Sequence, residues 1–405
     1  MEFELFMLIG IVGKPSVGKS TFFRAATLAE AEIANYPFTT IKPNNGVAYV
    51  KIDCVDKEFS KQCNPRVGYC LKGSRFVPVE MIDVAGLVPG AHEGKGRGNQ
   101  FLDDLRQADV LIHVIDISGS TNEKGEVVDS GSYDPAEDVK FLEVELDMWY
   151  LGILKKGWDK FARTIIQEKQ EIHLALGKQL SGLGVTEEMV ETAINNLNLD
   201  KEKPISWTDE ELRKLATVLR KHTKPMIIAG NKIDVPGGAE NLERLKKMFP
   251  EYIFIGCSAE SELALKEASK AGMIEYVPGS DSLEILKEDV LNDNQKKALK
   301  FIEDNILKKF GTTGVQIVLD KAIFELLGYL AIFPGGASKL EDKDGNTLPD
   351  CFLLPAMSTA LGFAYKLHTD LGKNFIRAID VKTKRTVGKE HPLQHRDVIE
   401  IIAGR

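Results

Sequence analysis

Short apolar runs, each ending in glycine or polar residues, recur through the first two thirds of the chain. They occupy residues 7–12, 76–82, 109–118, 226–230 and 252–257. Runs of this length bounded by turn residues are typical of buried parallel strands. After the first run, residues 21–32 carry apolar side chains at helical spacing. This alternation predicts an α/β fold in which a mostly parallel sheet is flanked by helices.

The stretch between residues 118 and 226 is longer than one helix and its loops require, so it predicts an insertion. Its apolar stripe indicates a long helix, bent or broken near Gly152 or Gly157 and paired with its neighbours as a helical hairpin. The stripe comprises Leu142, Leu146, Trp149, Ile153, Trp158, Phe161, Ile165, Ile172, Leu176 and Leu180. Core packing is the default meaning of this stripe, and a projecting coiled-coil arm that contacts a macromolecule is the alternative. Thr208 and Glu211 have capping-box spacing, which predicts a further helix over residues 206–222.

The pattern changes again near Gly328. Residues 342–346 carry a strong turn signal, and residues 357–371 have a helical pattern. Two later segments, 375–381 and 396–402, have the pattern of strands. Strands around one helix in so short a segment predict a small β-grasp domain.

Basic residues outnumber acidic ones between positions 366 and 396. They are Lys366, Lys373, Arg377, Lys382, Lys384, Arg385, Lys389 and Arg396. A solvated surface and an RNA-binding face both fit this excess. We expect Phe352, Phe363 and Tyr365 to lie in the core of the domain rather than to stack on bases.

Composition places the 405-residue chain among globular proteins of two or three domains, with 43% hydrophobic and 28% charged residues. The apolar runs are too short to cross a bilayer, and the acidic start lacks the basic region of a secretory signal, so we expect a cytoplasmic protein. The net charge of -8 argues against wholesale coating of nucleic acid. Five cysteines without a CxxC pair indicate neither a disulfide framework nor a zinc knuckle. We expect reduced, mostly buried thiols.

The first loop has the chemistry of a phosphate-binding site. Residues 13–20 fit G-x-x-x-x-G-K-[ST] between a predicted strand and a predicted helix. Glycines there allow backbone N–H groups to approach phosphate oxygens, and the helix N-terminus adds its dipole. Lys19 can bridge the outer phosphates, and the Ser20 hydroxyl can ligate Mg²⁺. The loop alone does not choose between ATP and GTP.

Two later strand ends carry matching signals. Asp83 opens a DxxG in which the carboxylate can hold a magnesium-bound water and the Gly86 N–H can meet the γ-phosphate. Residues 231–234 read NKxD, and an aspartate such as Asp234 can accept both the N1 and the N2 hydrogens of guanine, a pair that adenine lacks. Lys232 can lie along the base, and Ser258 with Ala259 can complete the pocket. Together these signals favour a guanine-nucleotide site.

Residues 35–44, NYPFTTIKPN, carry a closer resemblance. With the motifs above, they resemble the YPFTT switch segment of the YchF subfamily of Obg-family P-loop GTPases, of the archaeal type. The C-terminal segment resembles a TGS domain, the module shared with threonyl-tRNA synthetases and stringent-response enzymes, and the resemblance covers essentially the whole chain. It implies Mg²⁺ held by Ser20, Thr40 and, through water, Asp83, and a ribosome or RNA partner bound through the TGS and helical domains.

Two departures limit what the resemblance carries over. Leu87 stands where many GTPases place a glutamine that orients the attacking water, so the usual glutamine route is excluded. Family members share this replacement, which implies that another side chain, a cation or a partner orients water. The glycine-rich residues 88–98 include His92, Glu93, Lys95 and Arg97, which are expected to be solvated loop residues or, alternatively, to reach the γ-phosphate. Ser16 replaces the asparagine of potassium-using relatives, which leaves potassium dependence in doubt.

We therefore expect a GTPase domain over residues 1–120 and 224–290, an inserted helical domain over 121–223, a helical linker over 291–327 and a TGS domain over 328–405. The expected activity is slow intrinsic GTP hydrolysis by a molecular switch, with catalytic contributions from Lys19, Thr40, Asp83 and Gly86. An ATP-preferring hydrolase of the same fold and a nucleotide-gated scaffold without turnover are the alternatives, and we expect a monomer. Nucleotide is expected to contact Gly13, Pro15, Ser16, Val17, Gly18, Lys19, Ser20, Thr21, Asn231, Lys232, Asp234, Ser258 and Ala259.

Overall fold

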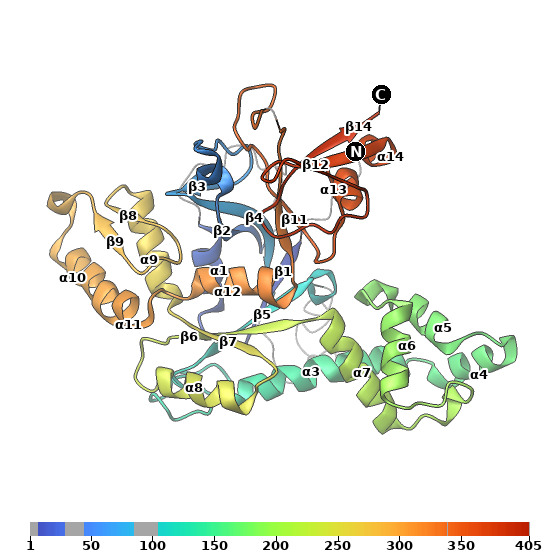
Figure 1. Cartoon of the computed structure of the whole chain (residues 1–405). Coiled ribbons are helices and arrows are strands. Elements are labelled where there is room, and N and C mark those ends of the chain that lie inside the picture. Colours follow the sequence, from blue (N-terminus) through green and yellow to red (C-terminus); the bar gives the residue numbers. More distant parts are fainter. Residues whose placement is uncertain (1–6, 29–43, 85–103, 338, 405) are drawn as a thin grey trace. The chain divides into compact units, whose positions relative to one another are not determined.

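The computed structural model describes residues 7–28, 44–84, 104–337 and 339–404 (Figure 1). The chain divides into two compact units. The first holds the residues up to 23 together with 81–259, and the second holds 24–80 and 260–405. Within the described ranges, no helix is both long enough and apolar enough to span a membrane.

The central sheet has the strand order β2-β4-β1-β5-β6-β7, with β3 paired to β4. Strands β1, β5, β6 and β7 run parallel, and every residue of β1, β5 and β6 is buried. This confirms the predicted α/β class, because strands covered on both faces read as continuous apolar runs. The strands are β1 (Leu8–Val12), β2 (Asn45–Asp53), β3 (Tyr69–Leu71), β4 (Ser74–Asp83), β5 (Val110–Asp116), β6 (Met226–Asn231) and β7 (Ile253–Cys257).

Five α-helices lie between β5 and β6, and α3 packs against α7 (Figure 1). The expected break falls at Gly157, whose left-handed backbone separates the end of α3 at Lys155 from the start of α4 at Trp158. Trp158 is buried and stacks on Trp207, and the capping box at Thr208 is confirmed. Most of the apolar stripe is buried, which supports its packing role. The helices are α3 (Ala136–Lys155), α4 (Trp158–Glu168), α5 (Ile172–Leu180), α6 (Glu187–Asn196) and α7 (Asp209–Thr223).

Further helices of the described residues lie in the part of the sequence predicted to form the GTPase domain. They are α1 (Lys19–Thr27), α8 (Gly238–Met248) and α9 (Ala259–Lys270). The sequence pattern predicts neither β8 (Ile274–Tyr276) nor β9 (Leu283–Ile285), which form an antiparallel hairpin. Ile274 and Tyr276 are buried and alternate with a half-buried position as in a strand, but β8 has only three residues, which is too short for this alternation to be recognised in the sequence.

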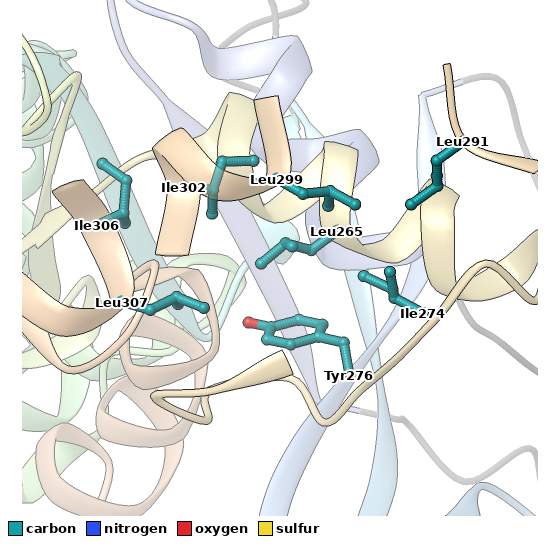
Figure 2. Close-up of a cluster of buried hydrophobic side chains, with 8 residues drawn as sticks. All are labelled: Leu265, Ile274, Tyr276, Leu291, Leu299, Ile302, Ile306 and Leu307. Carbon is teal, nitrogen blue, oxygen red and sulfur yellow. The ribbon is translucent and has the colours of Figure 1, made fainter. Parts of the chain in front are cut away.

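One apolar core joins α9, this hairpin and the helix that follows it (Figure 2). The following helix consists of α10 (Asp293–Ile302), a π-helical segment (Glu303–Leu307) and α11 (Lys308–Phe310). The core residues are Leu265, Ile274, Tyr276, Leu291, Leu299, Ile302, Ile306 and Leu307. They come from both sides of position 290, where the sequence suggested a change from GTPase domain to linker.

The C-terminal sheet has the order β11-β10-β14-β12-β13. Its strands are β10 (Leu330–Pro334), β11 (Phe352–Leu354), β12 (Phe375–Asp380), β13 (Arg385–Val387) and β14 (Val398–Ala403), and its helices are α13 (Ala360–Leu367) and α14 (Thr369–Lys373). Phe363 is buried in the core of this β-grasp fold, as predicted. Tyr365 is instead half exposed, and one side of its ring packs against Gly372. The predicted single helix is divided at His368, whose backbone is extended.

Helix α12 (Val315–Asp320) is joined to β2 through the carboxylate of Asp320. Asp320 Oδ1 accepts hydrogen bonds from the Lys51 N–H at 2.6 Å and from Gln316 Nε2 at 2.8 Å, and Gln316 also donates to the Tyr49 carbonyl. Burial raises the pKa of Asp320 to about 7, although both hydrogen bonds and Lys51 oppose the shift. The native protein therefore retains a proton on Asp320 that the unfolded chain releases near pH 4.

This raised pKa predicts that acid stabilises the second unit. Because the native state binds the extra proton, the Asp320 contribution to the free energy of unfolding should fall by about 2–3 kcal/mol between pH 5 and pH 7.5. We expect Asp320→Asn to remove this difference, as an amide keeps the accepting oxygen and does not titrate. Urea unfolding of both proteins at the two pH values measures it. Parallel pH profiles for the two proteins would contradict the prediction.

Candidate functional site

The loop between β1 and α1 is shaped by two close approaches to its glycines. A Cβ atom on Gly13 would lie 2.4 Å from the Val114 carbonyl oxygen, inside contact distance. One on Gly18 would lie 2.1 Å from Asn231 Nδ2, and Gly18 has a φ of +91°. Only glycine fits either position, so the loop backbone can run directly against β5 and β6. This is how the sequence pattern produces the loop geometry.

Asn231, at the end of β6, connects two loops of the site. Its Nδ2 donates to the Val17 carbonyl at 2.8 Å, and its Oδ1 accepts from the Ala259 N–H at 3.0 Å. The side chain is buried, and Ser258 beside it is buried as well. Both ends of the amide are therefore used within the protein. The first residue of NKxD holds the phosphate loop to the loop after β7.

Lys232 is held by an aspartate that the sequence analysis did not single out. Its Nζ lies 2.8 Å from Asp116 Oδ2, and Lys232 itself has a left-handed backbone. Asp116 is buried at the end of β5 and also accepts hydrogen bonds from the hydroxyls of Ser118, Ser120 and Thr121. Burial alone would raise the pKa of Asp116, but the hydrogen bonds from Lys232 and the serines outweigh it and lower the pKa. A charged Asp116 therefore fixes the path of Lys232.

Asp234 is the member of NKxD that remains accessible. Its side chain is exposed, and within the described part of the chain no hydrogen bond or ion pair engages its carboxylate. Pro15 and Ser16 are likewise exposed at the tip of the phosphate loop, where Ser16 has a φ of +64°. Thr21 is half-buried in the first turn of α1. The structure thus places an unpaired carboxylate on the strand edge that also carries Asn231.

Two oxygen donors and one lysine meet at the start of α1. Lys19 Nζ lies 3.4 Å from Asp83 Oδ1, and the Ser20 hydroxyl donates to Asp83 Oδ2 at 3.2 Å. Asp83 Oδ1 is buried and accepts no hydrogen bond from the described residues. A hydroxyl oxygen beside a carboxylate with free lone pairs fits Mg²⁺, which prefers oxygen ligands. Thr40, Gly86, Leu87 and the loop with His92, Glu93, Lys95 and Arg97 lie outside the described residues.

The second lysine of the loop, Lys14, has a different environment. Its ammonium lies 2.9 Å from Asp138 on α3, donates to the Thr121 carbonyl and sits 3.8 Å above the Tyr133 ring. Burial, together with the charge of Lys14, lowers the pKa of neighbouring His113 to about 3, so this imidazole is neutral. Lys14 therefore anchors the phosphate loop to the base of the helical insertion.

Comparisons with known proteins agree with this geometry. Residues 8–143 match the family model of 50S ribosome-binding GTPases, residues 229–335 match the Obg-like GTPase YGR210-like, G4 motif-containing domain, and residues 343–403 match the TGS domain. An uncharacterized GTP-binding protein of Methanocaldococcus jannaschii, MJ1332, is 52% identical over 98% of this chain and 99% of its own length. The chain belongs to the YchF subfamily of Obg-family P-loop GTPases.

Other YchF relatives extend across species and to solved structures. The ribosome-binding ATPase YchF of Bacillus subtilis is 27% identical over 96% of this chain and 97% of its own. The crystal structure of a GTP-binding protein from Pyrococcus horikoshii is 40% identical, covers 98% of this chain and 100% of its own, and superposes with a TM-score of 0.78. Membership of this GTPase subfamily implies guanine-nucleotide binding, usually with Mg²⁺, and nucleotide hydrolysis in general.

Proposed function

We propose that the protein binds GTP at the carboxyl ends of β1, β4, β6 and β7 and hydrolyses it slowly as a molecular switch. The observation that carries this proposal is the double hydrogen bonding of Asn231, which fixes the phosphate loop against the Ser258–Ala259 loop. Asp234 is left exposed beside this junction, with a carboxylate available for the N1 and N2 hydrogens of guanine. A base held there would lie within reach of a loop already shaped for phosphate.

The residues at the start of α1 support the hydrolytic half of the proposal. Lys19 can stabilise charge on the outer phosphates once it leaves Asp83. Ser20 directly and Asp83 through a water would hold Mg²⁺, which supplies positive charge to the phosphate oxygens. Thr40 and Gly86 complete the proposed set from sequence. Because Leu87 cannot hydrogen-bond to water, we propose that the intrinsic rate is slow and that a partner or another group orients the nucleophile.

ATP is the competing nucleotide, because several bacterial relatives are named ribosome-binding ATPases. Calorimetric titration of nucleotide-free protein with GDP and, separately, ADP, each with Mg²⁺, tests the choice. A site built to hydrogen-bond guanine should bind ADP at least ~100-fold more weakly, since its polar groups would be left unpaired. ADP binding as tight as GDP binding would overturn the assignment of the base to Asp234.

We further propose a ribosomal or RNA partner, because the bacterial relatives are named as ribosome-binding ATPases. The basic segment of the TGS domain supports the idea only in part, since Lys382 and Arg396 pair with Glu58. Four basic residues of this segment are exposed and form no ion pair with another described residue. They are Lys373, Arg377, Lys384 and Arg385. Such uncompensated charges are suited to phosphate contacts.

Charge reversal at two of these positions tests the partner. We expect the double variant Arg377→Glu and Arg385→Glu, on the paired strands β12 and β13, to weaken ribosome binding at least ~10-fold and to flatten its salt dependence, because phosphate contacts release counterions. Co-sedimentation with ribosomes over a salt series measures both effects. Lys297→Glu with Lys300→Glu on α10 makes the same charge change at exposed sites. Equal loss in both double variants would indicate a nonspecific charge effect and contradict the prediction.

A further inference from the structure

Three of the five cysteines converge in the hairpin that leads from β2 to β4. Cys54 follows β2, Cys63 lies in the loop after the short helix η1 (Val55–Phe59), and Cys70 lies on β3. Their sulfur atoms and one carboxylate oxygen of Asp56 all lie within 4.8 Å of one another. Cys54, Asp56 and Cys63 are buried, and Cys70 is half-buried. The cysteines are separated by stretches too long for a CxxC motif, so the sequence spacing did not reveal the cluster.

The distances within this thiol cluster fit a single ion. Four ligands bound tetrahedrally at ~2.3 Å from zinc lie roughly 3.7–3.8 Å from one another. The Cys54 and Cys63 sulfurs are 3.5 Å apart, well beyond the ~2.05 Å of a disulfide bond. Donor atoms this close surround one ion and leave no space for a polynuclear cluster. Thiolate-rich tetrahedral sets select zinc among the common divalent metals.

Asp56 provides a second, independent observation. Its side chain is 2% exposed, yet among the described residues no lysine or arginine lies within ion-pair distance of its carboxylate. The carboxylate instead accepts N–H bonds from Lys57 at 2.8 Å and Cys63 at 3.2 Å, which hold it toward the thiols. A buried carboxylate without an adjacent cation is costly. A bound cation would supply that charge.

We propose that Cys54, Asp56, Cys63 and Cys70 bind a structural zinc ion. As the zinc–sulfur bonds form, the three thiols release their protons to solvent, and no oxidation or reduction is involved. The resulting centre carries a net negative charge, and buried Arg75 is close enough to act electrostatically on Cys63. All four coordination positions are filled by protein, as in structural rather than catalytic zinc sites.

The position of the cluster gives the zinc a structural task. The loop that it would fix also presents Glu58 to Lys382 and Arg396, and Arg66 to Asp350 of the C-terminal segment. These ion pairs are partly exposed and weak individually, so their geometry depends on the loop that carries them. A metal that connects both ends of the loop to β3 would hold Glu58 and Arg66 opposite their ion-pair partners.

Metal analysis of the purified full-length protein tests the proposal. We expect one zinc per chain by mass spectrometry, and we expect Cys63→Ser to lose it while Cys257→Ala, which removes a buried thiol of the first unit, keeps it. Cobalt added to metal-stripped wild-type protein should give the intense ligand-field bands of four-coordinate thiolate binding, so the proposal remains testable if Cys63→Ser fails to fold. Absence of zinc and of cobalt binding, iron in place of zinc, or a Cys54–Cys63 disulfide would each overturn it.

Two more variants test the fourth ligand. Cys351 is near enough to Cys54 for an electrostatic interaction but lies outside the cluster. We therefore expect Asp56→Asn to weaken zinc retention at least ~10-fold against a chelator, in the range found when metal ligands or their supports are removed. Cys351→Ser should retain zinc as wild type does. Loss of zinc in Cys351→Ser with normal retention in Asp56→Asn would overturn the assignment of Asp56 and make Cys351 the fourth ligand.

Discussion

Replacing Asp234 by asparagine is expected to weaken GDP binding at least ~100-fold and to improve binding of xanthosine diphosphate. The aspartate can only accept hydrogen bonds, which suits the N1 and N2 hydrogens of guanine. Asparagine offers one acceptor and one donor, which suits xanthine, where a carbonyl replaces the N2 amino group. Because Asp234 is exposed and makes no contact that other described residues need, the change should leave the fold intact.

Calorimetry with GDP, xanthosine diphosphate and ADP, each with Mg²⁺, measures this exchange. Asp159→Asn makes the same chemical change at an exposed position on α4 and should leave all three affinities unaltered. If Asp234→Asn keeps its preference for GDP, the base does not lie against Asp234, and the proposed orientation of the nucleotide is wrong. Loss of all nucleotide binding in both variants would instead indicate damage to the protein.

Motifs made of consecutive residues could be identified from the sequence, whereas contacts between separate motifs could not. The glycines, Lys19 and Ser20 could be assigned because phosphate binding imposes a fixed local pattern on consecutive residues. Asp116 could not, because its importance depends on Lys232 reaching it from the next strand. A signal was present nonetheless: an aspartate at a strand end, followed by two serines and a threonine within five residues, is unusually rich in hydroxyl donors.

The same holds for the fold: periodic elements could be predicted, and contacts made where the chain turns back could not. The parallel strands and the capped helix α7 follow from periodicity, whereas the β8–β9 hairpin is too short to carry a period. Tyr365 has a helical spacing that suits a core residue, but half of it is exposed, and its ring packs against Gly372 beyond the helix break at His368. The thiol cluster likewise arises from the return of β3 beside η1. Each of these features depends on a turn or helix break that folds the chain back on itself, which periodicity alone does not show.

The hairpin with β2, β3 and β4 lies in the sequence between residues 35–44, which match the YPFTT switch segment, and the DxxG that begins at Asp83. In the second unit, the loop of this hairpin and strand β4 bind the 342–350 segment at the start of the TGS match. These hydrogen bonds connect the hairpin to the segment at which the TGS match begins.

Arg75→Ala is expected to loosen this connection and to lower the opening free energy of residues 343–403 by about 3–5 kcal/mol. Arg75, on β4, is fully buried and donates from Nη1 to the Leu348 carbonyl and from Nη2 to the Pro349 carbonyl, both at 3.0 Å. Alanine would leave a cavity the size of a large side chain and remove the side-chain donors to both carbonyls. Arg66→Met removes an exposed ion pair to the same segment and should cost no more than about 1 kcal/mol.

Hydrogen exchange of peptides from residues 343–403 measures the effect, and tryptophan fluorescence supplies an internal control. All three tryptophans lie in the helical insertion of the first unit, so their unfolding transition should be the same in wild type, Arg75→Ala and Arg66→Met. A matching loss of protection in both variants would show that the buried arginine has no special role. Unchanged protection in Arg75→Ala would mean that the core of the β-grasp domain alone determines its stability, without a contribution from the hairpin with β2, β3 and β4.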